Sequence, residues 1–281
     1  MILPQIVTKI SKEEGVLWNT VEKDYFLTLL LDGVANTPKL RKALIFKGGT
    51  ALRKIYFENY RYSEDLDFML KEKITESELK ASLEGIFEYL KKEYNASFNI
   101  KSVYKREWFS DIKVQFMGLQ GQKNTITIDV SSDEVLVGEP EQRKVINSYY
   151  DKKFEILVYS LEEILAEKLR SLLQRNRVRD YYDCWYLMTK AKSRIDFKEV
   201  RQIFDKKVKY KNIEFTGIAG MFETSKVESS KAYYEKQVGG QVKKLPDFDK
   251  LIAELKDSLL GSGYFNWGLI DGLKKSLKDG L

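Results

Sequence analysis

Four strand-like segments constrain the fold of this chain more than any other feature of its sequence. They cover residues 60–70, 98–108, 111–119 and 124–132, with sequences such as YRYSEDLDFML and NTITIDVSS. Successive side chains of a strand point to opposite faces, so an alternation of polar and apolar residues indicates a strand with one buried face. The four segments therefore predict a sheet with one apolar face and one polar face.

Helix-like segments accompany these strands. Residues 16–32 repeat apolar side chains every three or four positions, and residues 75–94 begin with Thr75 and Glu78 at the spacing of a capping box. Between them, the sequence ALIFKGGTALRKIYF changes from a short apolar strand to a glycine turn and then to a helical pattern. This order predicts a strand, a turn and a helix in succession.

The second half of the chain has a different character, because strand signals fade beyond about residue 155. The sequence SLEEILAEKLRSLLQ, residues 160–174, predicts a long amphipathic helix after a serine that is a candidate N-cap. The helical pattern returns near the C-terminus, whereas residues 206–247 have no clear assignment. We therefore expect an α/β (α+β) fold, with a mixed sheet flanked by helices in residues 1–155 and a mainly helical domain in residues 156–281 that closes the active-site cleft.

The composition limits the chemistry of the chain. Its 281 residues include no histidine and a single cysteine, Cys184. One cysteine forms neither an internal disulfide nor a thiolate zinc cluster, so neither is expected. Without histidine there is no imidazole base or metal ligand, and no Ser-His or Cys-His nucleophile. Any reaction must use carboxylates, lysine, arginine or hard metal ions.

The charge of the chain points to its class of partner. A formal net charge of +6 and a pI near 9.0 favour a polyanion such as nucleic acid, although many basic proteins bind none. No apolar stretch approaches the roughly 20 residues that cross a bilayer, and the N-terminal sequence MILPQIVTKISKEEG lacks the pattern of a secretion signal. We expect a cytoplasmic protein with no membrane span.

Three aspartates lie on the polar faces of the predicted strands. Asp65 and Asp67 are two residues apart and share a face, and Asp129 lies on the polar face of residues 124–132. Carboxylates that converge in this way suit Mg²⁺, which prefers oxygen ligands. Two such ions roughly 3.5–4 Å apart activate an attacking oxygen and stabilise a leaving pyrophosphate. Asp133 is the alternative third acid, but the phase of the strand favours Asp129.

A glycine pair precedes these acids. Gly48, Gly49 and Thr50 stand between a buried strand and a helix, where small residues let the backbone approach a phosphate and the start of the helix attracts negative charge. Most glycine pairs are only turns, and the Asp-x-Asp pattern alone is common by chance. The two features indicate a phosphate and metal site only because they occur together. A Walker-type phosphate loop is excluded because Lys47 precedes the glycines instead of following them.

These residues resemble a known motif. The sequence FKGGTALRKIYFENYRYSEDLDF, residues 46–68, is similar to the first motif of the AbiEii/AbiGii-type nucleotidyltransferase toxins, members of the polymerase-beta-like nucleotidyltransferase superfamily. That motif is a glycine pair or Gly-Ser, a short helix and Asp-x-Asp. Here 14 residues separate Thr50 from Asp65, a few more than in the shortest family members, and the run from Arg61 to Phe68 is close to the family form.

A second block resembles the downstream motif of the same family, in which a helical Glu-Lys is followed by Arg and then by Arg-Asp-x-Tyr-Asp. The corresponding residues are Glu167, Lys168, Arg175, Arg179, Asp180, Tyr182 and Asp183. The resemblance implies that Lys168 and Arg179 bind the nucleotide and that Asp180 orients Lys168 or supports the active site. An isolated lysine on a helix is usually solvated, so this role depends on the two motifs occurring in order.

The resemblance also implies a function. A nucleoside triphosphate is expected to bind with Mg²⁺ held by Asp65 and Asp67, with its phosphates near Gly48, Gly49, Thr50 and Lys168. Asp129 is expected either to complete the second metal site or to act as base toward the incoming hydroxyl. A nucleotidyl group then passes to an acceptor, which the resemblance implies is RNA, in particular the 3′ end of tRNA. The chain would be the toxin of a toxin–antitoxin or abortive-infection system, with a cognate antitoxin as partner.

Two other functions fit the same residues. One is transfer of a phosphoryl or nucleotidyl group to a protein acceptor, and the other is a non-catalytic module that binds RNA or a partner. The acids at all three positions argue against the second. The preferred nucleotide, the acceptor and the oligomeric state lie outside the sequence.

Several further residues carry two interpretations. Arg53 and Lys54 follow the glycines and are expected to face solvent, with phosphate binding as the alternative. The basic run KKVKYK, residues 206–211, is either a solvated surface or a contact to RNA. The aromatic residues of the second motif are either core or platforms for a base; they are Tyr181, Tyr182, Trp185 and Tyr186.

Overall fold

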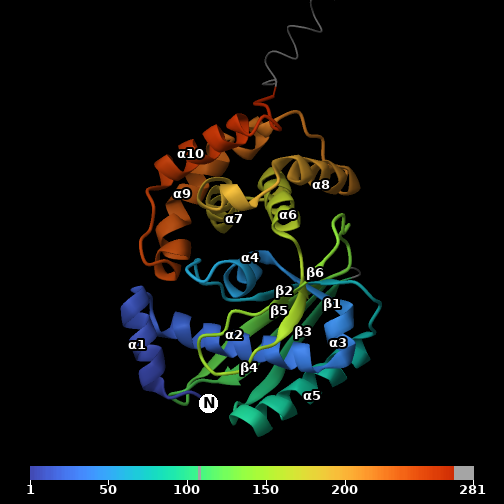
Figure 1. The fold of residues 1–281 in the computed structure, drawn as a ribbon, viewed down its shortest axis with the longest axis vertical. Coiled ribbons are helices and arrows are strands. Elements are labelled where there is room, and N and C mark those ends of the chain that lie inside the picture. The colour runs from blue at the N-terminus through green and yellow to red at the C-terminus, as the bar shows by residue number, and fades with distance from the viewer. Residues whose placement is uncertain (107–108, 269–281) are drawn as a thin grey trace, which may run out of the picture. The chain divides into compact units, whose positions relative to one another are not determined.

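The structure is a computed structural model that describes residues 1–106 and 109–268. The chain divides into two compact units (Figure 1). The first, the sheet unit, contains Met1–Glu134, Glu139–Ser160 and Gly240–Lys243. The second, the helical unit, contains Val135–Gly138, Leu161–Gly239 and the chain from Lys244 onward.

The sheet unit is built on one mixed sheet of seven strands in the order β3-β4-β5-β2-β1-β7-β6. The strands are β1 (Leu44–Lys47), β2 (Leu66–Leu70), β3 (Phe98–Arg106), β4 (Phe109–Met117), β5 (Lys123–Ser131), β6 (Glu141–Lys144) and β7 (Glu155–Val158). Two of the neighbouring pairs, β2 with β5 and β1 with β7, are parallel, and the others are antiparallel. The expected mixed sheet is confirmed.

Helices accompany the sheet within this unit. They are α1 (Pro4–Glu14), α2 (Trp18–Asn36), α3 (Pro38–Ala43), α4 (Gly48–Ala51), the π-helical turn η1 (Leu52–Tyr56) and α5 (Glu76–Tyr94). The capping box at α5 is confirmed, because Thr75 accepts a hydrogen bond from the backbone N–H of Glu78 at 3.3 Å and Glu78 accepts one from the N–H of Thr75 at 2.9 Å. These reciprocal bonds fix where α5 begins.

The apolar face of the sheet packs against α2 and α5 (Figure 1). Phe26 of α2 stacks on Phe116 of β4 with ring centroids 4.1 Å apart, and Phe87 of α5 lies 5.8 Å from Phe98 of β3. Because side chains alternate along a strand, this packing leaves the residues between the buried ones on the opposite, more polar face. The strands thus place their polar residues away from α2 and α5.

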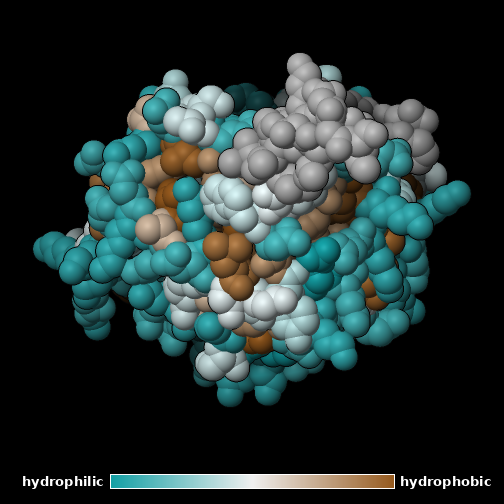
Figure 2. Space-filling model, turned by 90° about the horizontal axis from the view of Figure 1, so that it is seen from above, coloured by the Kyte–Doolittle hydropathy of each residue, from teal (hydrophilic) through white to brown (hydrophobic). Residues whose placement is uncertain are grey.

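The helical unit contains every described helix that follows the sheet. Its members are α6 (Leu161–Gln174), α7 (Val178–Trp185), the π-helical turn η2 (Tyr186–Lys190), η3 (Lys192–Arg194), α8 (Phe197–Tyr210), η4 (Ile218–Met221), α9 (Thr224–Val238), η5 (Gly239–Gln241) and α10 (Phe248–Gly261). The last two residues of η5 belong to the sheet unit. None of the helices in the described part of the chain has the length and apolar character needed to cross a bilayer. Figure 2 shows a face on which apolar residues gather within a hydrophilic surround.

A buried ion pair organises the start of the helical unit. Lys207 of α8 is 3% exposed and lies 2.7 Å from a carboxylate oxygen of Glu163 in α6. The same carboxylate accepts a hydrogen bond from the N–H of Gly138 at 3.0 Å, and Lys207 donates to the carbonyl of Val135 at 3.0 Å. Lys207 therefore has a structural role, and only the exposed members of the basic run, such as Lys206 and Lys209, are available to bind RNA.

The structure differs from the sequence prediction at several elements. β2 begins at Leu66, so Asp65 lies just before the strand and not within it. The short strands β6 and β7 were not predicted. β6 has no apolar residue, and β7 lacks the glycine turn that marked β1, a strand of the same length. The predicted strand 98–108 and the C-terminal helical pattern extend into residues 107–108 and 269–281, which lie outside the described residues.

Arg53 and Lys54 are buried, so the prediction that they face solvent is wrong. Arg53 is 7% and Lys54 3% exposed, and both point to Asp24 of α2, which is 1% exposed. Lys54 forms a short ion pair with one oxygen of Asp24, and Nε of Arg53 lies 3.5 Å from the other. Tyr149 donates a hydrogen bond to Asp24 at 2.6 Å. These bonds join the helix that follows the glycine pair to α2.

The electrostatics of this cluster favour the charged carboxylate. Burial alone would raise the pKa of Asp24, but the charges of Lys54 and Arg53 hold it below its ordinary value. The guanidinium of Arg53 also lies 3.4 Å from the ring centroid of Tyr62 and donates to the carbonyl of Tyr60 at 2.5 Å. Removing one member of a buried ion pair leaves the other charge uncompensated, at a cost of about 3–5 kcal/mol.

We predict that Asp24→Asn lowers the free energy of unfolding of the sheet unit by about 3 kcal/mol, because Lys54 and Arg53 lose their buried counter-charge. Urea denaturation followed by circular dichroism measures the change. Asp151→Asn, on the exposed surface of the same unit, is the matched control and leaves the midpoint unchanged. Equal midpoints for the two variants would show that the cluster does not stabilise the fold.

Candidate active site

The register of the sheet places Asp67 and Asp129 directly opposite each other. β2 and β5 are parallel neighbours, and their partners include Leu66 with Ile128 and Asp67 with Asp129. Leu66 and Ile128 are buried on the apolar face, so the two aspartates project together from the polar face. The structure thus brings together two of the three predicted acids. Asp65 precedes the same strand by one residue.

The backbone at the glycine pair lies against Asp67. Gly48 begins α4 with φ +80°, and a Cβ atom added there would stand 2.3 Å from Oδ2 of Asp67. No side chain fits in that space, and the backbone angle itself disfavours every residue except glycine. Gly48 is therefore required twice, for its conformation and for the close approach of the carboxylate.

Thr50 connects the same segment to Asp65. It is 1% exposed, and its hydroxyl donates a hydrogen bond to the backbone carbonyl of Asp65 at 2.5 Å. The bond holds the chain that leads into β2. Thr50, predicted to lie near the phosphates, thus positions Asp65 in this structure.

Two further charged residues share the row of Asp67 and Asp129, and the sequence analysis did not select either. Lys47 of β1 lies opposite Asp67, and Asp111 of β4 lies opposite Asp129. Lys47 is 7% exposed and its ammonium lies 2.6 Å from a carboxylate oxygen of Glu134. Pairing residues 109–117 with residues 123–131 across their short connection would have revealed Asp111.

The row therefore carries three carboxylates and one ammonium on four adjacent strands. Like charges directly opposite each other destabilise a sheet, so this arrangement favours a bound cation. Carboxylate oxygens are the donors that Mg²⁺ prefers, and the donor set fits that ion. Within the described residues, however, no three or more Asp, Glu, His or Cys side chains are already gathered as metal ligands.

The helical unit holds the other predicted residues. Nζ of Lys168, in α6, lies 2.7 Å from Asp180 and 2.9 Å from Asp183, both in α7. Asp180 also pairs with Arg175 at 3.0 Å. The carboxylates are 2% and 0% exposed, whereas the side chain of Lys168 is 12% exposed. The two aspartates fix the direction of the lysine, in agreement with an orienting role for Asp180.

Burial and charge oppose each other at Asp180. Burial alone would raise its pKa, but Lys168 and Arg175 hold the pKa below the ordinary value. The carboxylate therefore stays ionised and supports the charge of Lys168 at neutral pH. Arg179, from the same helix, is intermediate in exposure. Its predicted contact with nucleotide stays a prediction.

The aromatic residues of the second motif belong largely to the core. Tyr181 is 1% exposed and its hydroxyl donates to the carbonyl of Met221 at 2.6 Å. Tyr182 and Trp185 are each 6% exposed, and Trp185 donates from its indole N–H to Glu254 at 2.7 Å. Cys184 is buried in the same helix, and burial raises the pKa of its thiol, so it is a packing residue and not a nucleophile.

Solved structures share this fold. MenT4, a nucleotidyltransferase toxin from Mycobacterium tuberculosis H37Rv, superposes with a TM-score of 0.64 at 16% identity, over 92% of this chain and 88% of that one. A putative nucleotidyltransferase from H. pylori superposes with a TM-score of 0.52, also at 16% identity, over 85% of this chain and 92% of the other. The fold is thus one that nucleotidyltransferases use.

The family is identified by sequence. The profile of the family described as nucleotidyl transferase AbiEii toxin, type IV toxin–antitoxin system, matches residues 29–254. The chain belongs to this family of nucleotidyltransferases. Comparison with curated proteins gives no match. The match includes both motifs, from the glycine pair to the helices that carry Lys168 and Asp180.

We predict that Gly48→Ala abolishes nucleotide transfer while the protein stays folded, because the new methyl group displaces the Asp67 carboxylate. The matched control is Gly121→Ala, since Gly121 also has a positive φ, +81°, but nothing lies within 4 Å of its added Cβ. Both variants lose about 1–2 kcal/mol of stability from the strained backbone. Equal activities of the two variants would contradict the role of the Gly48 contact.

A second prediction concerns Lys168. Lys168→Met removes the charge between Asp180 and Asp183, and we expect it to destabilise the protein by about 3 kcal/mol at pH 7. At pH 4 the loss of stability is smaller. In the variant, Asp180 lacks Lys168 and takes up a proton more easily in the folded state, which removes the unpaired buried charge. In the wild type, the lowered pKa of Asp180 keeps the carboxylate ionised. Thermal unfolding at both pH values measures this difference, with the exposed Lys198→Met as control. A loss that does not change with pH would exclude the electrostatic explanation.

Proposed function

We propose that this protein transfers a nucleotidyl group from a nucleoside triphosphate to RNA, at the 3′ end of tRNA, and that Asp65, Asp67 and Asp129 hold the Mg²⁺ ions that the reaction requires. The observation that carries the proposal is the pairing of Asp67 with Asp129 on one face of the sheet, beside Gly48. In the cell the protein acts as the toxin of a type IV toxin–antitoxin system, and a cognate antitoxin counters it.

The chemistry of the residues supports a reaction that depends on metal. The chain has no histidine to serve as general base, whereas bound Mg²⁺ lowers the pKa of an attacking hydroxyl and neutralises charge on phosphate oxygens. Asp65 and Asp67 would hold the ions, and Asp129 lies opposite Asp67 on the adjacent strand. Asp129 either completes the second metal site or accepts the proton of the incoming hydroxyl.

The glycine segment supplies the support for the nucleotide. Gly48 and Gly49 begin α4 and carry no side chains of their own to screen its first backbone N–H groups, and such groups bind phosphate oxygens. Thr50 keeps Asp65 in place through its hydrogen bond to the backbone. The triphosphate and the metal ligands thus meet at the end of β1 and the start of β2.

The charge of the chain supports a nucleic-acid acceptor. A net charge of +6 favours binding to polyphosphate through release of counterions. A protein acceptor gains nothing comparable from this charge. RNA is therefore the acceptor that we propose, and a protein acceptor is the outcome that would replace it.

The test is incubation of the purified protein with total tRNA, Mg²⁺ and each of the four labelled nucleoside triphosphates. We expect label in RNA from one or two triphosphates, and none after addition of a chelator. Asp67→Asn and Asp129→Asn each lower the rate by roughly 100-fold or more, because each removes charge that stabilises the transition state. Asp133→Asn, the alternative third acid, retains activity. Label in an added protein fraction and none in RNA would refute the RNA acceptor.

A further inference from the structure

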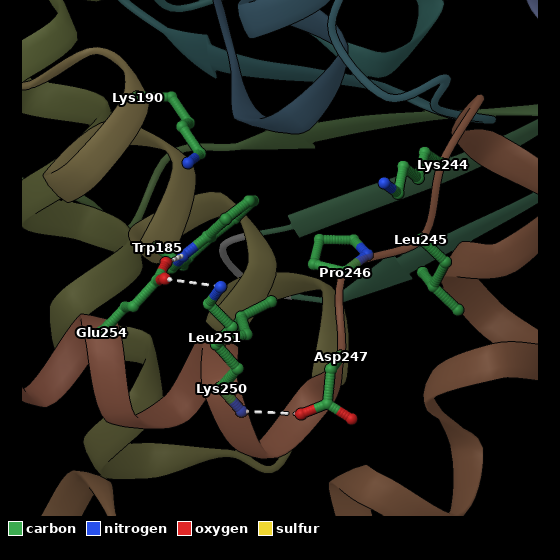
Figure 3. A pocket seen from close by; sticks show the side chains of 9 residues that line it. All are labelled: Trp185, Lys190, Lys244, Leu245, Pro246, Asp247, Lys250, Leu251 and Glu254. Atoms are coloured by element: carbon green, nitrogen blue, oxygen red, sulfur yellow. Dashed lines mark hydrogen bonds and ion pairs between the residues drawn. The ribbon is translucent and has the colours of Figure 1, made fainter.

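A pocket of about 440 Å³ lies in the helical unit, and its lining includes neither Lys168 nor Asp180. Figure 3 shows the side chains around it, which come from the end of α7, from η2, from the segment that leads into α10 and from α10 itself. The lining residues are Trp185, Lys190, Lys244, Leu245, Pro246, Asp247, Lys250, Leu251 and Glu254. Its size is that of a site for a small ligand or one residue of a polymer.

An aromatic ring and aliphatic side chains form the apolar part of this pocket. The indole of Trp185 is 6% exposed, since Tyr182 and the side chain of Lys190 lie against it, so a ligand can stack on its face only where Lys190 moves aside. The indole is held in place because its N–H donates to Glu254 at 2.7 Å. Leu245 and Pro246 lie across from it (Figure 3). A fixed indole beside an apolar wall suits a flat aromatic ligand, since stacking depends on a rigid face.

Three lysines surround this apolar part. Figure 3 shows Lys190, Lys244 and Lys250 entering from different sides of the pocket. The ammonium of Lys190 lies 5.2 Å from the ring centroid of Trp185, and all three lysines are exposed. An anionic group of a ligand that stacks on Trp185 thus meets a lysine on each of several sides.

The two acids of the pocket are engaged in local bonds. Asp247 caps α10 by accepting a hydrogen bond from the backbone N–H of Lys250 at 2.9 Å. Glu254 accepts from Trp185 and lies 3.8 Å from the ammonium of Lys250. The carboxylates therefore shape the pocket, and the lysines determine the sign of the charge it prefers.

We propose that this pocket binds one nucleotide of a single-stranded RNA, with the base stacked on Trp185 and the neighbouring phosphates on Lys190, Lys244 and Lys250. The proposal rests on the proposed function, because the RNA is the acceptor or its single-stranded end. A base that stacks on Trp185 replaces the weaker contact of Lys190, which then turns to a phosphate. Lysines on separate sides fit the spaced phosphates of a strand better than the adjoining phosphates of one triphosphate.

The first test measures binding and not activity. Anisotropy of a dye-labelled hexaadenylate RNA is recorded with the full chain and with the variant Lys190→Ala/Lys244→Ala/Lys250→Ala. The control, Lys192→Ala/Lys198→Ala/Lys236→Ala, removes three exposed lysines of the same unit that lie outside both the pocket and the basic run of residues 206–211, so the two variants have equal net charge. We expect at least tenfold weaker binding for the pocket variant and less than threefold for the control.

The salt dependence of binding gives a second readout. Each phosphate contact to a single strand contributes about 0.7 to the slope of log K against log salt concentration, so the pocket variant should lose about 2 from the slope. Equal slopes and affinities for the two triple variants would overturn the proposal, even if the wild type labels RNA. If the wild type failed to label RNA while the pocket variant still bound RNA more weakly, the proposed function would be overturned and the RNA-binding pocket would stand.

Trp185 tests the stacking itself. RNA should quench the tryptophan fluorescence of the wild type, and Trp185→Phe should lose most of that quenching while it stays folded. Competition with ATP and with a tetraglutamate peptide separates the other ligands. If ATP or the peptide displaced the labelled RNA at a lower concentration than unlabelled hexaadenylate does, the assignment of the pocket to an RNA strand would be overturned.

Discussion

Two carboxylates held directly opposite each other on neighbouring strands are the constraint on which the rest of this site depends. Asp67 and Asp129 cannot move apart without breaking the register of β2 and β5, because the residues that alternate with them on both strands are buried. Their repulsion is a cost to the sheet. In the proposed function, a divalent cation bound between them would offset this repulsion.

The glycine pair and the ion cluster of α2 serve this arrangement. Gly48 lets the backbone reach the Asp67 carboxylate, and the helix that follows is fixed to α2 by the pairs of Arg53 and Lys54 with Asp24. In the helical unit, Asp180 and Asp183 hold Lys168 in a similar way. Each segment that carries proposed site residues is thus anchored by buried ion pairs. Breaking a buried pair costs much more free energy of unfolding than breaking an exposed one.

The sequence predicted the elements whose pattern repeats and missed those that depend on distant contacts. Alternation located β5 and the phase of Asp129, and the spacing of Thr75 and Glu78 located the start of α5. Arg53 and Lys54 were misjudged because their partner, Asp24, is about 30 residues away and no local pattern shows it. Asp111 was missed because its place in the row depends on the register of β4 with β5. The return of residues 240–243 to the sheet unit has no signal in the sequence.

The most direct measurement of the central claim is the binding of Mn²⁺, a paramagnetic substitute for Mg²⁺, followed by electron paramagnetic resonance in the presence of a non-hydrolysable nucleoside triphosphate. We expect the wild type to bind the ion and Asp67→Asn/Asp129→Asn to bind it at least tenfold more weakly, while the double variant keeps its circular dichroism spectrum. Equal affinity in the two proteins would contradict the assignment of the paired carboxylates as metal ligands.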